Sequence, residues 1–100
     1  MDREAAQALV AAFSEFENSN TKLAVVWGAG GGFCAGWHLK RAATLTHPDL
    51  REAYFRDHGF GVGAAPVGPG ALGSSRKELS KPVIGAIEGA AVPGGVELAL

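Results

Sequence analysis

Two glycine-rich stretches carry the groups in this sequence that are best suited to chemistry. "WGAGGGFCAGWHL", 27–39, follows the apolar run "LAVV", and "GAAVPGGVELAL", 89–100, follows the apolar run "PVIGAI". A glycine-rich turn after a strand lets backbone N–H groups approach a ligand closely. Two such turns can aim two N–H donors at one point, an arrangement that stabilises negative charge on a carbonyl oxygen. The same glycines also fit two tight turns beneath helices that bind nothing, so both interpretations stay open at this point.

Glu97 is the one carboxylate within the second stretch. It lies three residues after Gly94, about one turn along an expected helix, so the two residues share a face. Its neighbours, Val96 and 98–100, are all apolar. Such surroundings predict poor solvation and a raised pKa for the Glu97 carboxyl, as a general acid or base requires. The alternative is an ordinary glutamate in the first turn of a helix, where the helix dipole favours a negative charge.

A dinucleotide site is the main competing explanation for the glycines. Its fingerprint is G-x-G-x-x-G/A directly after a strand. The first frame, 28–33, has Phe33 at the position where the fingerprint requires glycine or alanine, so it does not match. A second frame, 30–35, ends on Ala35 but begins two residues late, and a third, 59–64, follows no strand. The sequence therefore argues against a dinucleotide, because loose matches to a short glycine pattern arise easily by chance.

A long amphipathic helix is expected at the start of the chain, from Asp2 to Asn18. Asp2 suits the N-cap, and "NSN", 18–20, ends the helix. Apolar residues recur at three- and four-residue steps and form one face, which we expect to be the core face. These residues are Ala5, Leu9, Ala12, Phe13 and Phe16.

The remaining chain alternates strands, glycine turns and helices. Buried strands are expected over 22–27 and 81–89 because both are apolar, and Pro82 falls at the start of the second, where a missing N–H does least harm. Helices are expected over 38–45, 48–58 and the end of 90–100, with Pro93 at a first helical position. The stretch 59–75, rich in glycine and proline, predicts a flexible loop or lid. This order indicates an α/β fold whose strands pair in parallel.

Composition limits the classes of partner. The chain has 100 residues, 47% of them hydrophobic, and a formal net charge of −1. Without a basic block, we expect no binding to nucleic acid or to an anionic membrane. Cys34 is the single cysteine and forms no internal disulfide, which fits a reducing compartment. The start "MDREAAQALV" lacks the features of a signal peptide. We expect a cytoplasmic protein, with the mitochondrial matrix as the eukaryotic alternative.

Together, these residues resemble two signatures of the crotonase (enoyl-CoA hydratase/isomerase) family. "VVWGAGGGFCAGWHLK", 25–40, is similar to a strand followed by G-A-G-x-x-F-C-A-G-x-D-L-K. "LSKPVIGAIEGAAVPGGVELAL", 79–100, is similar to K-P-V-I-A-A-V-x-G-x-A-x-G-G-G-x-E-L-A-L. The resemblance implies a crotonase-like ββα spiral, here a partial domain over 1–100. It looks truncated at both ends, because the last helix lacks a C-terminal cap and no strand precedes the first helix.

The resemblance also assigns roles to residues of this chain. It implies a coenzyme A thioester as substrate and an oxyanion hole formed by the backbone N–H groups of Trp37 and Gly94. Glu97 matches one of the two catalytic glutamates of hydratases. The segment from Ala35 to Lys40 would line the path of the coenzyme. The residues implied in substrate binding are Ala35, Gly36, Trp37, His38, Leu39, Lys40 and Gly94.

Three positions depart from the family pattern. His38 replaces the usual aspartate, which is mainly structural in the family, so this change bears on the anchoring of the loop more than on its chemistry. Pro93 replaces the first of three glycines, which leaves the Gly94 donor in place. Trp37 is bulky where small residues are common, but its N–H remains. Cys34 matches a common structural cysteine, and we expect no nucleophilic role for it.

We therefore expect an enoyl-CoA hydratase-like lyase that adds water across the 2,3-double bond of an acyl-CoA, as in fatty-acid β-oxidation. No metal and no separate cofactor is expected, because coenzyme A is part of the substrate. The family also implies a trimer or hexamer for a full-length chain. Alternatives are an enoyl-CoA isomerase, another crotonase reaction, or a truncated chain that binds acyl-CoA without turnover. The second catalytic carboxylate and the groups that hold the coenzyme phosphates are expected outside these 100 residues.

Overall fold

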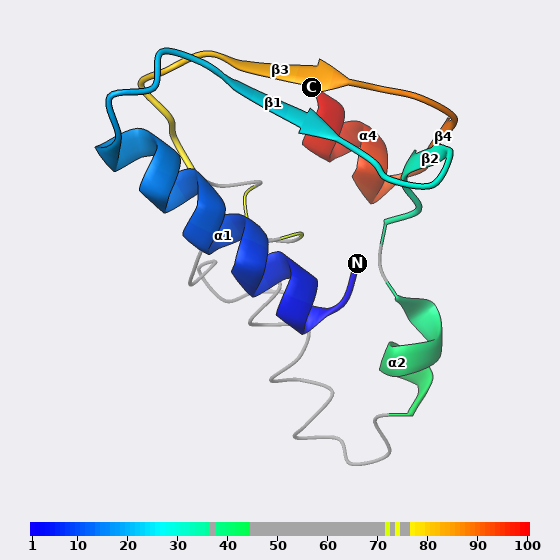
Figure 1. Ribbon diagram of the computed structural model, residues 1–100. Helices are drawn as coiled ribbons and strands as arrows, with labels where there is room; N and C mark the ends of the chain where they lie inside the picture. Colours follow the sequence, from blue (N-terminus) through cyan, green and yellow to red (C-terminus); the bar gives the residue numbers. More distant parts are fainter. Residues whose placement is uncertain (37, 45–71, 73, 75–76) are drawn as a thin grey trace.

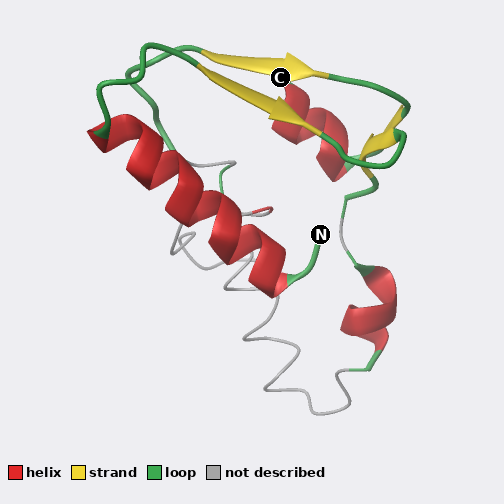
Figure 2. Cartoon of the chain, viewed as in Figure 1, coloured by secondary structure: helices red, strands yellow, loops and turns green. Residues whose placement is uncertain are grey.

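The fold combines helices with short parallel strands (Figures 1 and 2). The computed structural model describes residues 1–36, 38–44, 72, 74 and 77–100. In chain order, its helices and strands are α1 (Arg3–Asn18), β1 (Ala24–Trp27), β2 (Gly32–Cys34), α2 (Leu39–Ala43), β3 (Val83–Ala86), β4 (Ala90–Ala91) and α4 (Gly94–Ala99). The predicted α/β class is confirmed.

Helix α1 begins and ends as the sequence predicts. The Asp2 carboxylate accepts a hydrogen bond from the Ala5 N–H at 3.0 Å, which makes Asp2 the N-cap. This bond lowers the pKa of the Asp2 carboxyl because it stabilises the charged form. At the other end, the Ser19 N–H donates to the Phe16 carbonyl at 3.1 Å and closes the last turn.

The predicted core face of α1 is only partly correct. Phe13 is buried, and Leu9 and Phe16 are half-buried, but Ala5 and Ala12 are exposed. The alanines face a hollow between α1 and the strands, and their side chains are too short to cross it.

Two separate pairs of parallel strands make up the β-structure of the described residues. β1 pairs with β3, and their register runs from Ala24 opposite Val83 to Trp27 opposite Ala86. This parallel pairing confirms the sequence prediction. β2 pairs with β4 and was not predicted, because only three and two residues form these strands and both lie in glycine-rich stretches.

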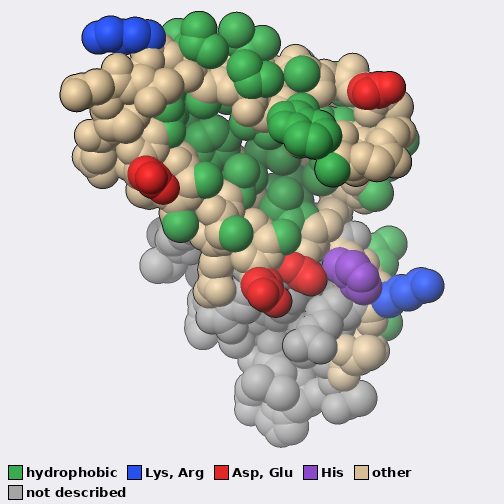
Figure 3. Space-filling view, in the orientation of Figure 1, with side chains coloured by type: hydrophobic (Ala, Val, Ile, Leu, Met, Phe, Trp, Pro, Cys, Tyr) green, Lys and Arg blue, Asp and Glu red, His purple; other side chains and the backbone are tan. Residues whose placement is uncertain are grey.

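The expectation that β1 and β3 are buried strands is wrong. Val25, Trp27 and Ile84 are 53%, 67% and 52% exposed, and all four residues of β3 are exposed. Hydrophobic side chains gather over the sheet in Figure 3. The reason is that a parallel sheet needs a layer on each face, whereas no described residues cover this one fully.

The buried part of the described chain lies elsewhere. Helix α4 packs on β2 and β4. The buried hydrophobic side chains are Ala6, Phe13, Phe33 and Leu72.

The other predicted elements are tested to different degrees. The expected helix over 38–45 forms as α2 and is shorter. The expected helix over 48–58 lies outside the described residues, as does all of the predicted loop 59–75 except Leu72 and Ser74. No helix among the residues described combines the length and the apolar character needed to cross a membrane.

Candidate functional site

The two glycine-rich stretches meet at Gly36 and Gly94. A Cβ atom built on Gly36 would lie 3.1 Å from the Val92 carbonyl oxygen and 3.5 Å from the Gly94 nitrogen. Gly36 has a φ of +73°, a conformation that favours glycine. Two segments separated by almost sixty residues of sequence are therefore in backbone contact. Gly94 is one of the two predicted donors, and Gly36 directly precedes the other, Trp37, in the sequence.

A second close contact holds α4 against β2. The Val92 N–H donates to the Cys34 carbonyl at 3.0 Å. A Cβ atom on Gly95 would lie only 2.0 Å from that same carbonyl oxygen, so any larger residue would force the two backbones apart. We call the region around these contacts the glycine junction: residues 34–36 of the β2 end and residues 92–95 at the start of α4.

The Gly94 N–H is the available donor at this junction. The N–H groups of Gly95 and Val96 each donate at 3.0 Å, to the carbonyls of Val92 and Pro93 respectively, and that of Glu97 donates to Pro93 at 3.4 Å. Among the described residues, the Gly94 N–H has no backbone acceptor, as expected for a first-turn amide. It can therefore donate to a carbonyl oxygen from a ligand.

The other predicted site residues lie around this junction in different ways. Trp37, the other predicted donor, lies outside the described residues. Gly36 is buried, whereas Ala35 and His38 are exposed. The His38 N–H donates to the Met1 carbonyl at 2.9 Å, so this loop lies against the start of α1.

Leu39 and Lys40 are less closely tied to the site. Both belong to α2 and are exposed, Leu39 by 75%. Figure 1 shows α2 leading away from α4. The structure therefore brings together Gly36 and Gly94, and it does not bring Leu39 and Lys40 to the junction.

Glu97 lies in the first turn of α4, three residues after Gly94, as predicted. Its side chain is exposed, so the expectation of poor solvation is wrong for the structure described here. The physical reason is that α4 is buried through Gly95 alone, which leaves the Glu97 side of the helix open to solvent.

Leu72 is a contact of the junction that sequence analysis missed. It is 1% exposed, and its Cδ1 atom would lie 3.2 Å from a Cβ on Gly94. The only signal in the sequence is a lone leucine within the glycine-rich run "PGALGSS". It supplies an apolar wall beside the predicted donor.

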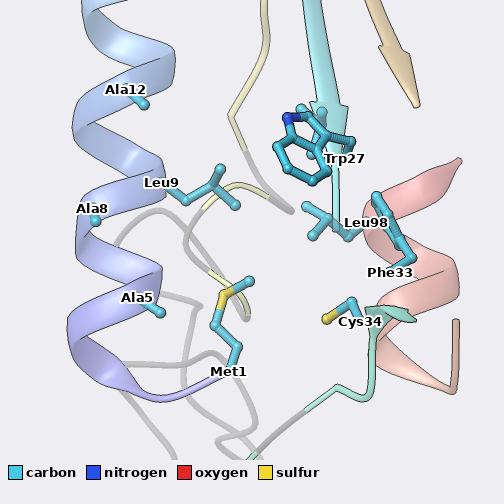
Figure 4. Close-up of a pocket in the computed structure, with 10 residues that line it drawn as sticks. Met1, Ala5, Ala8, Leu9, Ala12, Trp27, Phe33, Cys34 and Leu98 are labelled. Atoms are coloured by element: carbon cyan, nitrogen blue, oxygen red, sulfur yellow. The ribbon is translucent and has the colours of Figure 1, made fainter. Parts of the chain in front are cut away.

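An apolar pocket of about 400 Å³ lies between α1 and the strands (Figure 4). None of the described residues predicted for the site lines it. The alanine spacing on α1 is the signal that could have indicated it, because three small side chains leave space on an apolar face. Its lining residues are Met1, Ala5, Ala8, Leu9, Ala12, Val26, Trp27, Phe33, Cys34 and Leu98.

A metal centre finds no support in the described part of the chain. No three His, Cys, Asp or Glu side chains gather there closely enough to hold an ion.

Comparison with known proteins identifies the class to which this site and fold are similar. No protein-family model matches the chain. Solved structures of an enoyl-CoA hydratase and of a probable enoyl-CoA hydratase/isomerase do match it, as do curated proteins named carnitinyl-CoA dehydratase and enoyl-CoA hydratase. The resemblance to the crotonase superfamily, predicted from the two signatures, is confirmed in sequence and in fold.

The individual relatives give the extent of the similarity. Carnitinyl-CoA dehydratase of Proteus mirabilis is 41% identical over 86 residues, which cover 84% of this chain and 28% of the relative. Enoyl-CoA hydratase EchA19 of Mycobacterium tuberculosis is 34% identical over 99 residues, 98% of this chain and 34% of the relative. The chain thus spans about a third of the length of the curated relatives it matches.

The structural neighbours agree. The crystal structure of a probable enoyl-CoA hydratase/isomerase from Mycobacterium abscessus has a TM-score of 0.71 and 33% identity, covering 99% of this chain and 32% of that one. Enoyl-CoA hydratase EchA1 from Mycobacterium marinum has a TM-score of 0.64 and 30% identity, covering 95% of this chain and 31% of that one.

Proposed function

We propose that this protein is an enoyl-CoA hydratase-like lyase. It adds water across the 2,3-double bond of an acyl-CoA thioester, or removes water in the reverse direction. The observation that carries the proposal is the contact between Gly36 and Gly94. The Gly94 N–H has no backbone acceptor among the described residues. In the two signatures, Gly36 precedes Trp37 by one residue and Gly94 precedes Glu97 by three. The relatives named above include a carnitinyl-CoA dehydratase and an enoyl-CoA hydratase.

The chemistry requires stabilisation of an enolate. When water attacks the β-carbon of an enoyl thioester, negative charge develops on the thioester oxygen. The N–H groups of Gly94 and Trp37 would hold this charge, each contributing about 3–4 kcal/mol if it behaves like other oxyanion donors. Protonation at the α-carbon then completes the addition.

Glu97 would handle the proton. It belongs to the first turn of α4 and lies about one helical turn from the Gly94 donor, so a water beside a carbonyl bound at Gly94 would lie on the same face of the helix. We propose that it orients or deprotonates that water, or delivers the proton. Its exposure in this structure means that substrate or further protein would have to cover it during the reaction.

Further parts of the proposal concern binding and context. The segment from Ala35 to Lys40 would line the coenzyme path, no separate cofactor takes part, and an intact subunit would assemble as a trimer or hexamer. The protein would work in the cytoplasm, or in the mitochondrial matrix of a eukaryote.

The test is an enoyl-CoA hydration assay on the natural protein from its source cells. Glu97→Gln should lower kcat by about a hundredfold or more, because a general acid or base is lost while the shape is kept. Glu88→Gln is the matched control, since Glu88 is also exposed but precedes β4. Near-normal activity of Glu97→Gln would contradict the role of Glu97.

Other outcomes of the assay distinguish the alternatives. Movement of the double bond without addition of water would indicate an enoyl-CoA isomerase. Binding of acyl-CoA without any turnover would indicate a binding chain that lacks a second carboxylate.

A further inference from the structure

A set of polar contacts joins the last two turns of α1 to the segment 77–81. The Ser80 N–H donates to the Glu17 carboxylate at 3.0 Å, and the Ser80 hydroxyl donates to the same oxygen. Lys77 Nζ donates to the Ser14 hydroxyl at 3.0 Å. These contacts join residues more than sixty positions apart, so they hold the segment 77–81 against the end of α1. We call this set, together with Lys81, the polar clamp.

Lys81 makes the contacts of the clamp that cap the C-terminal end of α1. Its Nζ donates to the Phe16 carbonyl at 2.8 Å and to the Ser19 carbonyl at 2.6 Å, and it lies 5.1 Å from the centre of the Phe16 ring. The last turn of α1 has no basic residue of its own. Lys81 therefore supplies from a distant part of the chain the positive charge that a helix C-terminus favours. Charge-assisted bonds to two carbonyls and a cation–π contact hold it there.

The position of Lys81 bears directly on the strand register. The next residue, Pro82, accepts a hydrogen bond from the Ala24 N–H at 3.1 Å, and the register then begins with Ala24 opposite Val83. From this pair, one arm runs through β1 and β2 to Gly36, and the other runs through β3 and β4 to Gly94. A slip of one residue would move one arm by about 3.3 Å relative to the other.

Such a slip would separate the two halves of the glycine junction. Reactive groups must be held within about 0.5 Å of their working geometry. The β1–β3 sheet does little to prevent a slip, because both strands expose apolar side chains and burial does not strongly specify their register.

We propose that Lys81 is a positioning residue: by capping α1, it sets the register of β3 on β1 and so brings Gly94 beside Gly36. Its consequence for turnover rests on the proposed function, whereas its effect on the register does not. The charge of Lys81, rather than its length alone, provides the anchor.

The test compares Lys81→Met, Lys81→Arg and Lys77→Met in ¹⁵N-labelled protein. Lys81→Met should shift the amide resonances of Gly36 and Gly94 and weaken the NOEs between Ala24 and Val83. Lys81→Arg should restore both, because it keeps the charge and the donors. Lys77→Met is the matched control: it removes one lysine contact of the clamp but leaves both bonds from Lys81 to the carbonyls of Phe16 and Ser19, so it should leave the resonances and the NOEs unchanged. A folded Lys81→Met with wild-type register NOEs and a wild-type Gly94 resonance would overturn the proposal.

A milder variant covers the case in which Lys81→Met does not fold. Lys81→Gln keeps a donor without the charge and should give intermediate shifts at Gly36 and Gly94, whereas wild-type spectra would overturn the proposal. Binding of an acyl-CoA to the wild-type protein is measured separately. If the wild type binds no thioester, the proposed function fails, and the register result still decides the role of Lys81.

Discussion

The glycine junction and the β1–β3 sheet differ in how closely their atoms are packed. At the junction, backbones touch so closely that a Cβ on Gly95 would lie 2.0 Å from a carbonyl oxygen. In the sheet, large apolar side chains are present but stay exposed, as Trp27 does by 67%. The close contact at the junction thus depends on glycines, which lack side chains, whereas the sheet consists of large side chains that the described residues do not fully cover.

This difference indicates where the function depends on atomic fit. At Gly95 the junction leaves no room for an added atom, because two backbones share the space. An open sheet face tolerates substitution of its side chains, because an exposed side chain that changes in size alters only its contact with water. Substitutions at the two places should therefore differ in effect even when they add or remove the same small group.

Gly95→Ala should have the largest effect on stability. The new Cβ would collide with the Cys34 carbonyl, and we expect a loss of about 2–3 kcal/mol in the free energy of unfolding. Urea denaturation followed by circular dichroism measures it. Gly32→Ala is the matched control, because Gly32 has open space around its Cβ direction and no positive φ. Equal losses in the two variants would contradict the tight contact at Gly95.

Gly36→Ala should have the next largest effect and should separate strain from crowding. Gly36 and Gly30 both have a positive φ, +73° and +88°, so alanine at either costs about 1–2 kcal/mol of backbone strain. Only Gly36 has neighbours within 4 Å of its Cβ direction. Calorimetric titration with an acyl-CoA should therefore show weaker binding for Gly36→Ala and unchanged binding for Gly30→Ala. Unchanged binding in both variants would show that the acyl-CoA does not bind at the glycine junction.

Neighbouring valines of β1 test the sheet itself. Val26 lines the apolar pocket and is half-buried, whereas Val25 is 53% exposed. Val26→Thr should cost about 1 kcal/mol because a hydroxyl enters an apolar space. Val25→Thr should change stability by less than about 0.5 kcal/mol. Thermal unfolding of the two variants makes the comparison, and a larger loss at Val25 would show that the open face is covered in solution.

The smallest effect is expected from the pH dependence of the polar clamp. Hydrogen bonds from Ser80 lower the pKa of Glu17 below its ordinary value of 4.5. Because the folded-state pKa is the lower one, this contribution to stability is complete above pH 4.5 and is lost as the pH falls through the lowered value. Unfolding measured from pH 6 downward should show a smaller acid-induced loss for Glu17→Gln than for the wild type. Identical acid profiles would show that the ionised Glu17 carboxylate contributes nothing to stability through the polar clamp.

The sequence predicted the elements better than their surroundings. Asp2, the period of apolar residues and the terminal asparagine predicted α1 closely, because capping and periodicity are local. The parallel strands followed from glycine turns after apolar runs. The exposure of Val25, Ile84 and Glu97 could not be predicted, because burial depends on which layers pack around a segment. Strand β4 was missed because two residues carry no periodic signal.

The candidate site was predicted to a similar degree. Gly94 and Gly36 were named from their motifs, and the structure brings them into contact. Leu72 was not named, because a single leucine in a glycine-rich run has no pattern that links it to a position more than twenty residues away. Lys81 lies within the second signature, but its contacts with α1 depend on tertiary structure.

One measurement tests the central claim, that the Gly94 N–H receives a thioester carbonyl. ¹⁵N-labelled protein is titrated with an acyl-CoA thioester and, separately, with the matching thioether, which lacks only the carbonyl oxygen. The account predicts a downfield shift of the Gly94 amide proton with the thioester and little shift with the thioether. Equal shifts with both ligands, or an unmoved Gly94 amide at saturation with the thioester, would contradict it.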